Sequence, residues 1–201
     1  MAEQLIVALG REFGSGGHEI ARLLADRLSL PLLEDNMLRQ IAQEKGLNPR
    51  QVAQYDESPR TVLIYRTVNG FSNAPEDVVA EMQFQYLREQ ADAGNSFVVV
   101  GRCGDEILKE YPGFVSFFIW ADEWFKKERT MAREPISEEE ALELMARKDR
   151  KRRAYHSQYC KGKWGDARGY DLCINSAKLG IEGTAALLEQ YIRERIRKAN
   201  H

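Results

Sequence analysis

The stretch Leu5-Ile-Val-Ala-Leu-Gly-Arg-Glu-Phe-Gly-Ser-Gly-Gly-His-Glu-Ile20 decides the fold of this chain. Its apolar beginning, residues 5–9, is typical of a buried strand, and a glycine-rich turn follows at once. An amphipathic helix is predicted over 17–28. A strand, a glycine-rich turn and a helix in this order direct several backbone N–H groups and a helix N-terminus at an anion. The stretch therefore predicts a phosphate-binding loop, formed by Gly14, Ser15, Gly16, Gly17 and His18.

This loop departs from the standard P-loop sequence G-x-x-x-x-G-K-S/T. With Gly16 in the second glycine position, Gly17 stands in place of the lysine, His18 in place of the Ser or Thr, and Arg11 at the first glycine position. The glycines also fit a tight turn that needs positive φ angles and close packing, and the loop alone does not separate the two interpretations. If the loop binds phosphate, the bridging cation must come from elsewhere.

Composition narrows the class of protein. The chain has 201 residues, of which 43% are hydrophobic and 30% charged, as expected for one globular domain spanning 1–201. A net charge of -2 argues against a general nucleic-acid binder. No apolar run approaches the roughly 20 residues of a membrane span, and none suits a signal peptide, so we expect a cytoplasmic protein. The spacing of its three cysteines and three histidines predicts neither a metal site nor a disulfide framework.

Short apolar runs alternate with amphipathic segments along the chain. Strands are predicted at 5–9, 30–33, 97–100, 115–120 and 170–174, and helices at 17–28, 35–45, 75–93, 103–110, 122–132, 137–158 and 181–198. This alternation predicts an α/β fold with a parallel sheet and right-handed crossovers. Ligands of such sheets bind beyond the carboxyl ends of the strands, where the glycine loop lies. Two segments, 35–93 and 133–168, are expected to project from the sheet.

The second projecting segment carries the run Arg147-Lys-Asp-Arg-Lys-Arg-Arg153, with six cations in seven positions. A run of this kind often forms only a solvated helix face. Because it lies between two strands and the glycine loop lacks its lysine, we favour a lid whose arginines stabilise a transferring phosphoryl group. The candidates for catalytic charge are Arg11, Arg147 and Arg152, and the lid adds Asp149, Arg150 and Arg153.

Polar side chains also follow two other predicted strands. Arg102 comes directly after the third strand, where it can hold a second phosphate or pair with Asp105 or Glu106. Glu34 and Asp35 end the second strand. Their carboxylates can contact a substrate hydroxyl or amine, hold Mg²⁺ through water, or cap the following helix. These observations make Glu34, Asp35 and Arg102 candidate acceptor-binding residues.

Several motifs, taken in order, resemble the cytidylate kinase-like family, a divergent branch of the nucleoside monophosphate kinases. They are G-R-E-F-G-S-G-G-x-E-I at 10–20, L-P-L-L-E-D at 30–35, V-V-V-G-R-C at 98–103, D-x-x-R-x-x-Y at 149–155 and W-G-D-x-x-x-Y-D-L-C-I-N at 164–175. The resemblance implies a P-loop NTPase-like three-layer fold with a five-stranded parallel sheet in the order 2-3-1-4-5. It also implies a monophosphate-binding segment at 35–93 and a helical lid at 133–168.

The resemblance assigns roles to individual residues. Residues 14–17 stand where the family cradles the donor phosphates, and Asp149 and Arg152 match its lid pattern Asp-x-x-Arg. Arg102 stands in its Gly-Arg-Asp motif, which contacts the acceptor monophosphate, although Cys103 replaces the Asp. The P-loop lysine and the small glycine after it are replaced by Gly17 and His18.

Two classes of function follow from these observations. The first is an ATP-dependent kinase of a small phosphorylated acceptor, such as CMP or another nucleoside monophosphate, with Mg²⁺ carried by ATP and no dedicated metal site. The second is a nucleotide-binding sensor or partner-binding module without transfer, which the missing lysine favours. A kinase acting on a non-nucleotide acceptor would differ only in residues 35–93. Small nucleotides, rather than nucleic acid or membrane, are the expected partners, and the oligomeric state stays open.

Overall fold

A parallel sheet forms the centre of the protein. The computed structural model describes residues 4–60, 67–68, 71–72 and 74–199. The sheet has five strands in the order β2-β5-β1-β6-β7. Numbered among themselves along the chain, these strands have the order 2-3-1-4-5, which confirms the prediction. Their bounds are β1 Ile6–Arg11, β2 Leu32–Leu33, β5 Phe97–Val100, β6 Phe114–Trp120 and β7 Leu172–Asn175.

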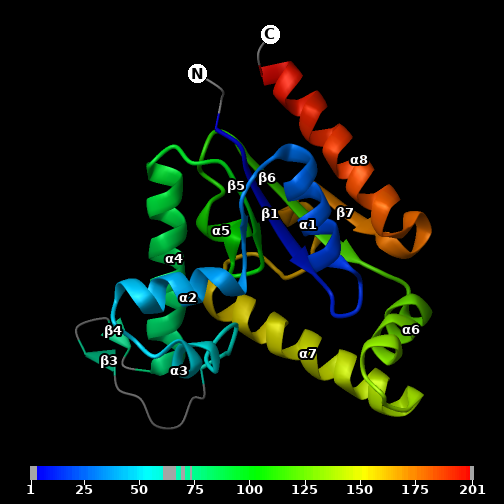
Figure 1. Cartoon of the computed structure of the whole chain (residues 1–201), viewed down its shortest axis with the longest axis horizontal. Helices are drawn as coiled ribbons and strands as arrows, with labels where there is room; N and C mark the ends of the chain where they lie inside the picture. Colours follow the sequence, from blue (N-terminus) through cyan, green and yellow to red (C-terminus); the bar gives the residue numbers. More distant parts are fainter. Residues whose placement is uncertain (1–3, 61–66, 69–70, 73, 200–201) are drawn as a thin grey trace.

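Helices cover both faces of the sheet, as Figure 1 shows. Helices α1 (Gly17–Leu28) and α8 (Ser176–Ala199) lie on one face, and α2 (Asp35–Glu44), α4 (Pro75–Asp92) and α5 (Gly104–Ile107) lie on the other. Successive side chains of β1 alternate between the two cores: Val7 and Leu9 face α1 and α8, while Ile6 and Ala8 face α2 and α4. Burial on both faces explains why the strands read as continuous apolar runs.

Two segments project from the carboxyl ends of the strands. The first contains α2, α3 (Pro49–Ala53), the short strands β3 (Thr67–Val68) and β4 (Phe71–Ser72), and α4. The second contains α6 (Glu123–Arg133), α7 (Glu138–Tyr159) and a 3-10 turn, Ala167–Gly169. In Figure 1, α7 runs across the strand ends below the sheet. Its end meets the first segment, where the Tyr159 hydroxyl donates a 2.5 Å hydrogen bond to Asp77.

Local chemistry sets where these helices begin. Ser137 and Glu140 form the capping box of α7, with the Ser137 N–H donating to the Glu140 carboxylate at 2.8 Å. Asn48 caps α3, a helix that the polar segment 46–74 did not predict. The helix predicted at 103–110 spans only Gly104–Ile107. It starts one residue later because Cys103 takes a φ of 53°, and it ends at Leu108, which leaves the helical conformation. Helix α8 starts five residues before the predicted 181, and it is kinked at Gly180.

Candidate functional site

A cavity of about 270 Å³ opens at the carboxyl ends of the strands. The glycine loop forms one wall, Glu34 after β2 and Arg102 after β5 form another, and Arg133 and Arg152 approach from α6 and α7. The residues that sequence reasoning drew from separate segments therefore meet at one place. No helix within the described ranges is long and apolar enough to cross a membrane.

The glycine loop leaves the N-terminus of α1 open toward this cavity. Gly14 and Gly16 have φ angles of 79° and 80°, in the region that favours glycine. Gly16 is the N-cap residue of α1, and no side chain caps the helix there. The first N–H groups of α1 thus lack a side-chain cap, and the positive end of the helix dipole faces the cavity. An anion in the cavity would satisfy both.

Gly17 lies against the side chain of Arg11. A Cβ atom added at Gly17 would stand only 2.5 Å from the Cβ of Arg11. The space in which a P-loop lysine would begin is therefore occupied by Arg11, which also lines the cavity. The glycine at position 17 is therefore required by the neighbouring Arg11 side chain, which leaves no room for a lysine there.

This contact predicts that restoring the P-loop sequence harms the protein. We expect Gly17→Lys to lower steady-state ADP formation by about tenfold or more, because the new side chain displaces Arg11 and misplaces the loop. Gly162→Lys is the matched control, since it adds the same charge at an exposed position where no atom of the described part of the chain beyond its neighbours lies within 4 Å of the new Cβ. Faster turnover in Gly17→Lys would show that Arg11 does not replace the lysine.

The remaining members of the predicted loop have different surroundings. Ser15 is fully buried, its hydroxyl donates to the carbonyl of Glu12 at 2.8 Å, and its own carbonyl accepts from Ser176 at 2.6 Å. This side chain holds the loop in shape. His18 is half exposed, and its Nδ1 lies 2.6 Å from Oε2 of Glu34. Glu34 is thus drawn toward the loop, and Asp35 begins α2 with a side chain outside the described part.

Glu57 lies at the centre of three arginines. Both of its carboxylate oxygens accept hydrogen bonds from Arg11, at 2.9 and 3.1 Å. Its Oε1 also accepts from the backbone N–H of Arg102 at 3.2 Å, and Nε of Arg152 lies 3.9 Å from Oε2. Burial alone would raise the pKa of Glu57, but the charges of Arg11 and Arg102 lower that pKa well below its usual value. Glu57 is thus a largely buried anion, with a side chain 15% exposed, among cationic groups.

Arg102 is the most deeply buried of the three arginines. Its side chain is 3% exposed, its Nη2 lies 2.5 Å from Oδ2 of Asp56, and its Nη1 donates to the carbonyl of Val100 at 2.9 Å. The strand-end position predicted an orientation toward the crevice, and Arg102 does line the cavity. Its partner Asp56 lies in the polar segment after α3, in which no site residue was predicted from the sequence.

Of the lid cations, Arg152 reaches the cavity. Its Nη1 donates to the carbonyl of Arg11 at 3.4 Å, and its guanidinium lies over the ring of Phe13, 5.8 Å from the centroid. Burial first and the charge of Arg11 second lower the pKa of Arg152 to about 10, so it stays charged at neutral pH. Asp149, one turn earlier, accepts a 2.7 Å hydrogen bond from the Phe13 N–H.

The other predicted lid residues point elsewhere. Arg147 and Arg150 are exposed and do not line the cavity. Arg153 is also exposed and lies over the ring of Trp164, 5.5 Å from its centroid. The basic run at 147–153 was interpreted either as a solvated helix face or as a source of cations for the site, and it contains both kinds of side chain. Most of its cations form a solvated face, and Arg152 faces inward.

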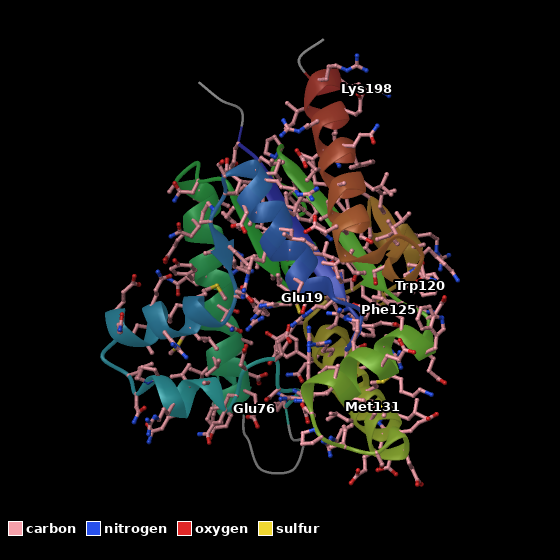
Figure 2. All side chains as sticks on the ribbon, turned by 45° about the vertical axis from the view of Figure 1, so that its right-hand side comes forward. Glu19, Glu76, Trp120, Phe125, Met131 and Lys198 are labelled. Carbon is pink, nitrogen blue, oxygen red and sulfur yellow. The ribbon has the colours of Figure 1, made fainter. Side chains whose placement is uncertain are left out.

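Helix α6 contributes cations that sequence reasoning missed. Arg129 and Arg133 both form ion pairs with Glu19, in the first turn of α1. Figure 2 labels Glu19 together with Phe125 of α6, on whose ring Arg129 lies. Lys126 pairs with Glu12 of the loop, with Nζ 2.7 Å from Oε2. These residues give no motif in the sequence, because α6 reads as an ordinary amphipathic helix.

Solved structures share this fold. A protein from Eubacterium ventriosum is 34% identical, with a TM-score of 0.75 over 94% of this chain and 99% of that chain. Shikimate kinase from Bacteroides thetaiotaomicron is 12% identical, with a TM-score of 0.56 over 94% of this chain and 98% of that chain. A gluconokinase from Sinorhizobium meliloti is 15% identical, with a TM-score of 0.55 over 99% and 98%. At these two lower identities the likeness concerns the fold alone.

Sequence comparison places the chain in a family. A cytidylate kinase of Pyrococcus horikoshii is 25% identical over 193 residues, which cover 94% of this chain and 89% of that protein. The sequence profile of the cytidylate kinase-like family matches residues 6–178, nearly the whole chain. The sheet order and the glycine loop after β1 agree with this match. The chain belongs to the cytidylate kinase-like family.

Proposed function

We propose that the protein transfers the γ-phosphoryl group of ATP to a small phosphorylated acceptor, with CMP as the first candidate. One observation carries the proposal. Arg11, Arg102 and Arg152 come from three separate segments and surround a pair of carboxylates beside the glycine loop: the Arg11 and Arg152 side chains and the Arg102 backbone N–H face Glu57, and the Arg102 guanidinium pairs with Asp56. Membership in a kinase family supports the reaction class, and the 25% identity to a cytidylate kinase supports CMP as the acceptor to test first.

The donor phosphates would lie on the glycine loop. Backbone N–H groups at the start of α1 bind phosphate oxygens without any side chain, so the cradle does not need the missing lysine. Mg²⁺ prefers oxygen ligands and keeps several waters, and the carboxylates of Glu12 and Glu34 line this cavity. These residues fit a magnesium ion that arrives with ATP and is held through water. When bound, the ion would neutralise charge on the donor phosphates.

Arginine side chains would carry the remaining charge stabilisation. Phosphoryl transfer needs in-line positioning and positive charge rather than a covalent intermediate. Arg11 occupies the place of the P-loop lysine, and Arg152 reaches over the loop from α7. We assign residues 133–168 the role of a lid, because Asp149 and Arg152 of α7 make polar contacts with the glycine loop and Arg133 pairs with Glu19 of α1. Such contacts can exchange when substrates bind.

Glu57 occupies the position that an acceptor phosphate would take. A phosphate group and a carboxylate both accept paired hydrogen bonds from a guanidinium group, so they compete for Arg11. Glu57 also has a φ of 44°, an uncommon conformation for a residue other than glycine. We infer that the carboxylate holds the arginines in place without substrate and moves aside when the acceptor phosphate enters.

This exchange predicts that weakening Glu57 favours the acceptor. Glu57→Gln is expected to lower the KM for the acceptor several-fold, because a neutral amide competes less well for the three arginines. Steady-state kinetics at saturating ATP give the KM, and Glu44→Gln, an exposed residue of the same segment, is the control. A higher KM in Glu57→Gln would mean that the Glu57 carboxylate itself contacts the acceptor.

One observation favours a second function. The loop lacks the P-loop lysine, so the protein could bind a nucleotide as a sensor without transferring its phosphoryl group. ADP formation with ATP and Mg²⁺, measured across nucleoside monophosphates and non-nucleotide acceptors, separates the two. Acceptor-dependent ADP formation supports the kinase. Calorimetric ATP binding without ADP formation from any acceptor supports the sensor.

A further inference from the structure

A second cluster of reactive side chains lies where the turn after β5 meets the end of α7. Ligand-type atoms of Asp105, His156 and Cys160 all lie within 4.8 Å of one another. Oδ2 of Asp105 is 2.7 Å from Nε2 of His156. His156 lies in the last turn of α7, and Cys160 directly follows the helix as its C-cap residue, with its backbone N–H donating to the His156 carbonyl at 2.8 Å. Both side chains are buried, at 5% and 9% exposure. None of these three side chains is among the residues assigned above to phosphate binding.

Cys103 borders this cluster, next to Cys160, and lies outside the group whose ligand atoms are all within 4.8 Å of one another. Its thiol hydrogen bonds with Cys160, and its side chain is 3% exposed. Cys103 is the N-cap residue of α5 and Asp105 lies in the first turn of that helix, whereas His156 lies in the last turn of α7 and Cys160 directly follows it. Two sulfurs, one imidazole nitrogen and one carboxylate oxygen form a donor set of the kind that binds zinc in tetrahedral sites.

Polar atoms in this cluster are incompletely satisfied. Nδ1 of His156 is buried and has no hydrogen-bond partner of ordinary geometry among the described residues, although the Cys160 thiol interacts with the same ring. The buried Tyr155 hydroxyl, next to His156 in the chain, also lacks such a partner among those residues. Both residues line a small cavity of about 20 Å³ together with Cys103 and Asp105, and Glu57 and the three arginines line its other side; Cys160 lies behind this lining. Buried polar atoms are normally paired, so two unpaired ones mark this cluster as incompletely satisfied. Nδ1 lies across the ring from the Asp105 contact, so Nε2 is the His156 atom that shares a site with the Asp105 carboxylate.

We propose that Asp105, His156 through Nε2, and Cys160 bind a zinc ion in place of the Asp105–His156 hydrogen bond, and that the Cys103 side chain turns in from beside Cys160 as the fourth ligand. The ion would join the β5–α5 turn to the end of α7. Arg102 directly precedes Cys103, and Arg152 lies four residues before His156, so the ion would fix the relative position of two of the three arginines. Loss of two thiol protons on binding leaves three anionic donors around a divalent cation, and the nearby Arg102 and Arg152 balance the remaining negative charge.

Zinc content tests the site directly. We expect the full-length protein, reduced, incubated with ZnSO₄ and desalted, to contain one zinc ion per chain by mass spectrometry of the metal. The protein loaded with Co²⁺ is expected to show a sulfur-to-cobalt charge-transfer band, which reports thiolate ligands without any activity assay. Cys160→Ser and Cys103→Ser should each lower zinc affinity by at least about tenfold. Cys173→Ser is the matched control, because this third cysteine lies in β7 and outside the cluster.

Stability measurements keep the result interpretable if a variant folds poorly. Zinc is expected to raise the melting temperature of the wild type and of Cys173→Ser, and to leave Cys160→Ser unchanged, because only an ion bound to the native state stabilises it. Circular dichroism shows whether each variant is folded. Three results would overturn the proposal: wild-type protein without stoichiometric zinc, equal loss of zinc in Cys173→Ser and Cys160→Ser, or an oxidised Cys103–Cys160 pair in place of the ion.

Discussion

Replacing Arg152 with alanine is expected to lower kcat by about 10²-fold or more, with ATP affinity changed only a few-fold. Arg152 contacts the carbonyl of Arg11 and lies near Glu57, at the side of the cavity where the lid meets the loop. Its charge would act mainly in the transition state, when negative charge spreads over the transferring group. Steady-state kinetics with the acceptor varied give kcat, and calorimetry gives the ATP affinity.

Two further variants make this result specific. Lys148→Ala removes an exposed charge from the same helix and should leave kcat unchanged. Arg102→Ala should act differently from Arg152→Ala, by raising the acceptor KM more than it lowers kcat, because a bidentate phosphate contact is already made in the ground state. If Arg152→Ala keeps the wild-type kcat, the transferring group takes its positive charge from another residue.

Gly16→Ala is expected to abolish measurable nucleotide binding in a folded protein. The φ of 80° at Gly16 costs roughly 1–2 kcal/mol for a residue with a Cβ atom, and the new Cβ would stand 2.1 Å from Cδ1 of Ile181. The Ile181 methyl can turn aside, but the φ strain is relieved only by a change in the loop backbone, and the N–H groups at the start of α1 shift with it. Isothermal calorimetry with ATP and Mg²⁺ measures the effect.

Gly94 offers the matched control for this substitution. Gly94 has a φ of 77° and follows α4, and a Cβ atom added there would have no atom within 4 Å among the described residues. Gly94→Ala therefore introduces backbone strain without a collision. We expect Gly94→Ala to lose a comparable part of its stability and to keep its ATP affinity. Equal ATP affinity in folded Gly16→Ala and wild type would exclude residues 14–17 as the phosphate cradle.

The central sheet could be predicted because its signals are local. Buried strands are continuous apolar runs, and the turn from β1 into α1 is specified by glycines within a few residues. The face of α7 that looks inward was also encoded. Met145 and Tyr155 are buried positions of this helix, and helical spacing from them places Asp149 and Arg152 on the inner face. Arg147 was chosen because it belongs to the basic run, although helical spacing from Met145 and Tyr155 does not place it on the inner face. In the structure it lies at the surface.

Other parts of the site had no such signal. Asp56 and Glu57 lie in a polar segment without periodicity, and their roles depend on the long-range approach of Arg11 and Arg102. The Cys103 and Cys160 pair comes from residues more than 50 positions apart, so no metal-ligand spacing was visible. Side chains brought together by the topology can be grouped only after the strand order is known.

The most direct test of the account is to follow the reaction by ³¹P NMR. Wild-type protein with ATP, Mg²⁺ and CMP is expected to produce the resonances of ADP and CDP in equal amounts, and Arg152→Ala should produce neither at a comparable rate. If CMP is not the acceptor, the same spectrum recorded with other phosphorylated acceptors should show ADP and one new phosphorylated product. ADP with inorganic phosphate alone, or unchanged ATP with every acceptor tried, would contradict the account.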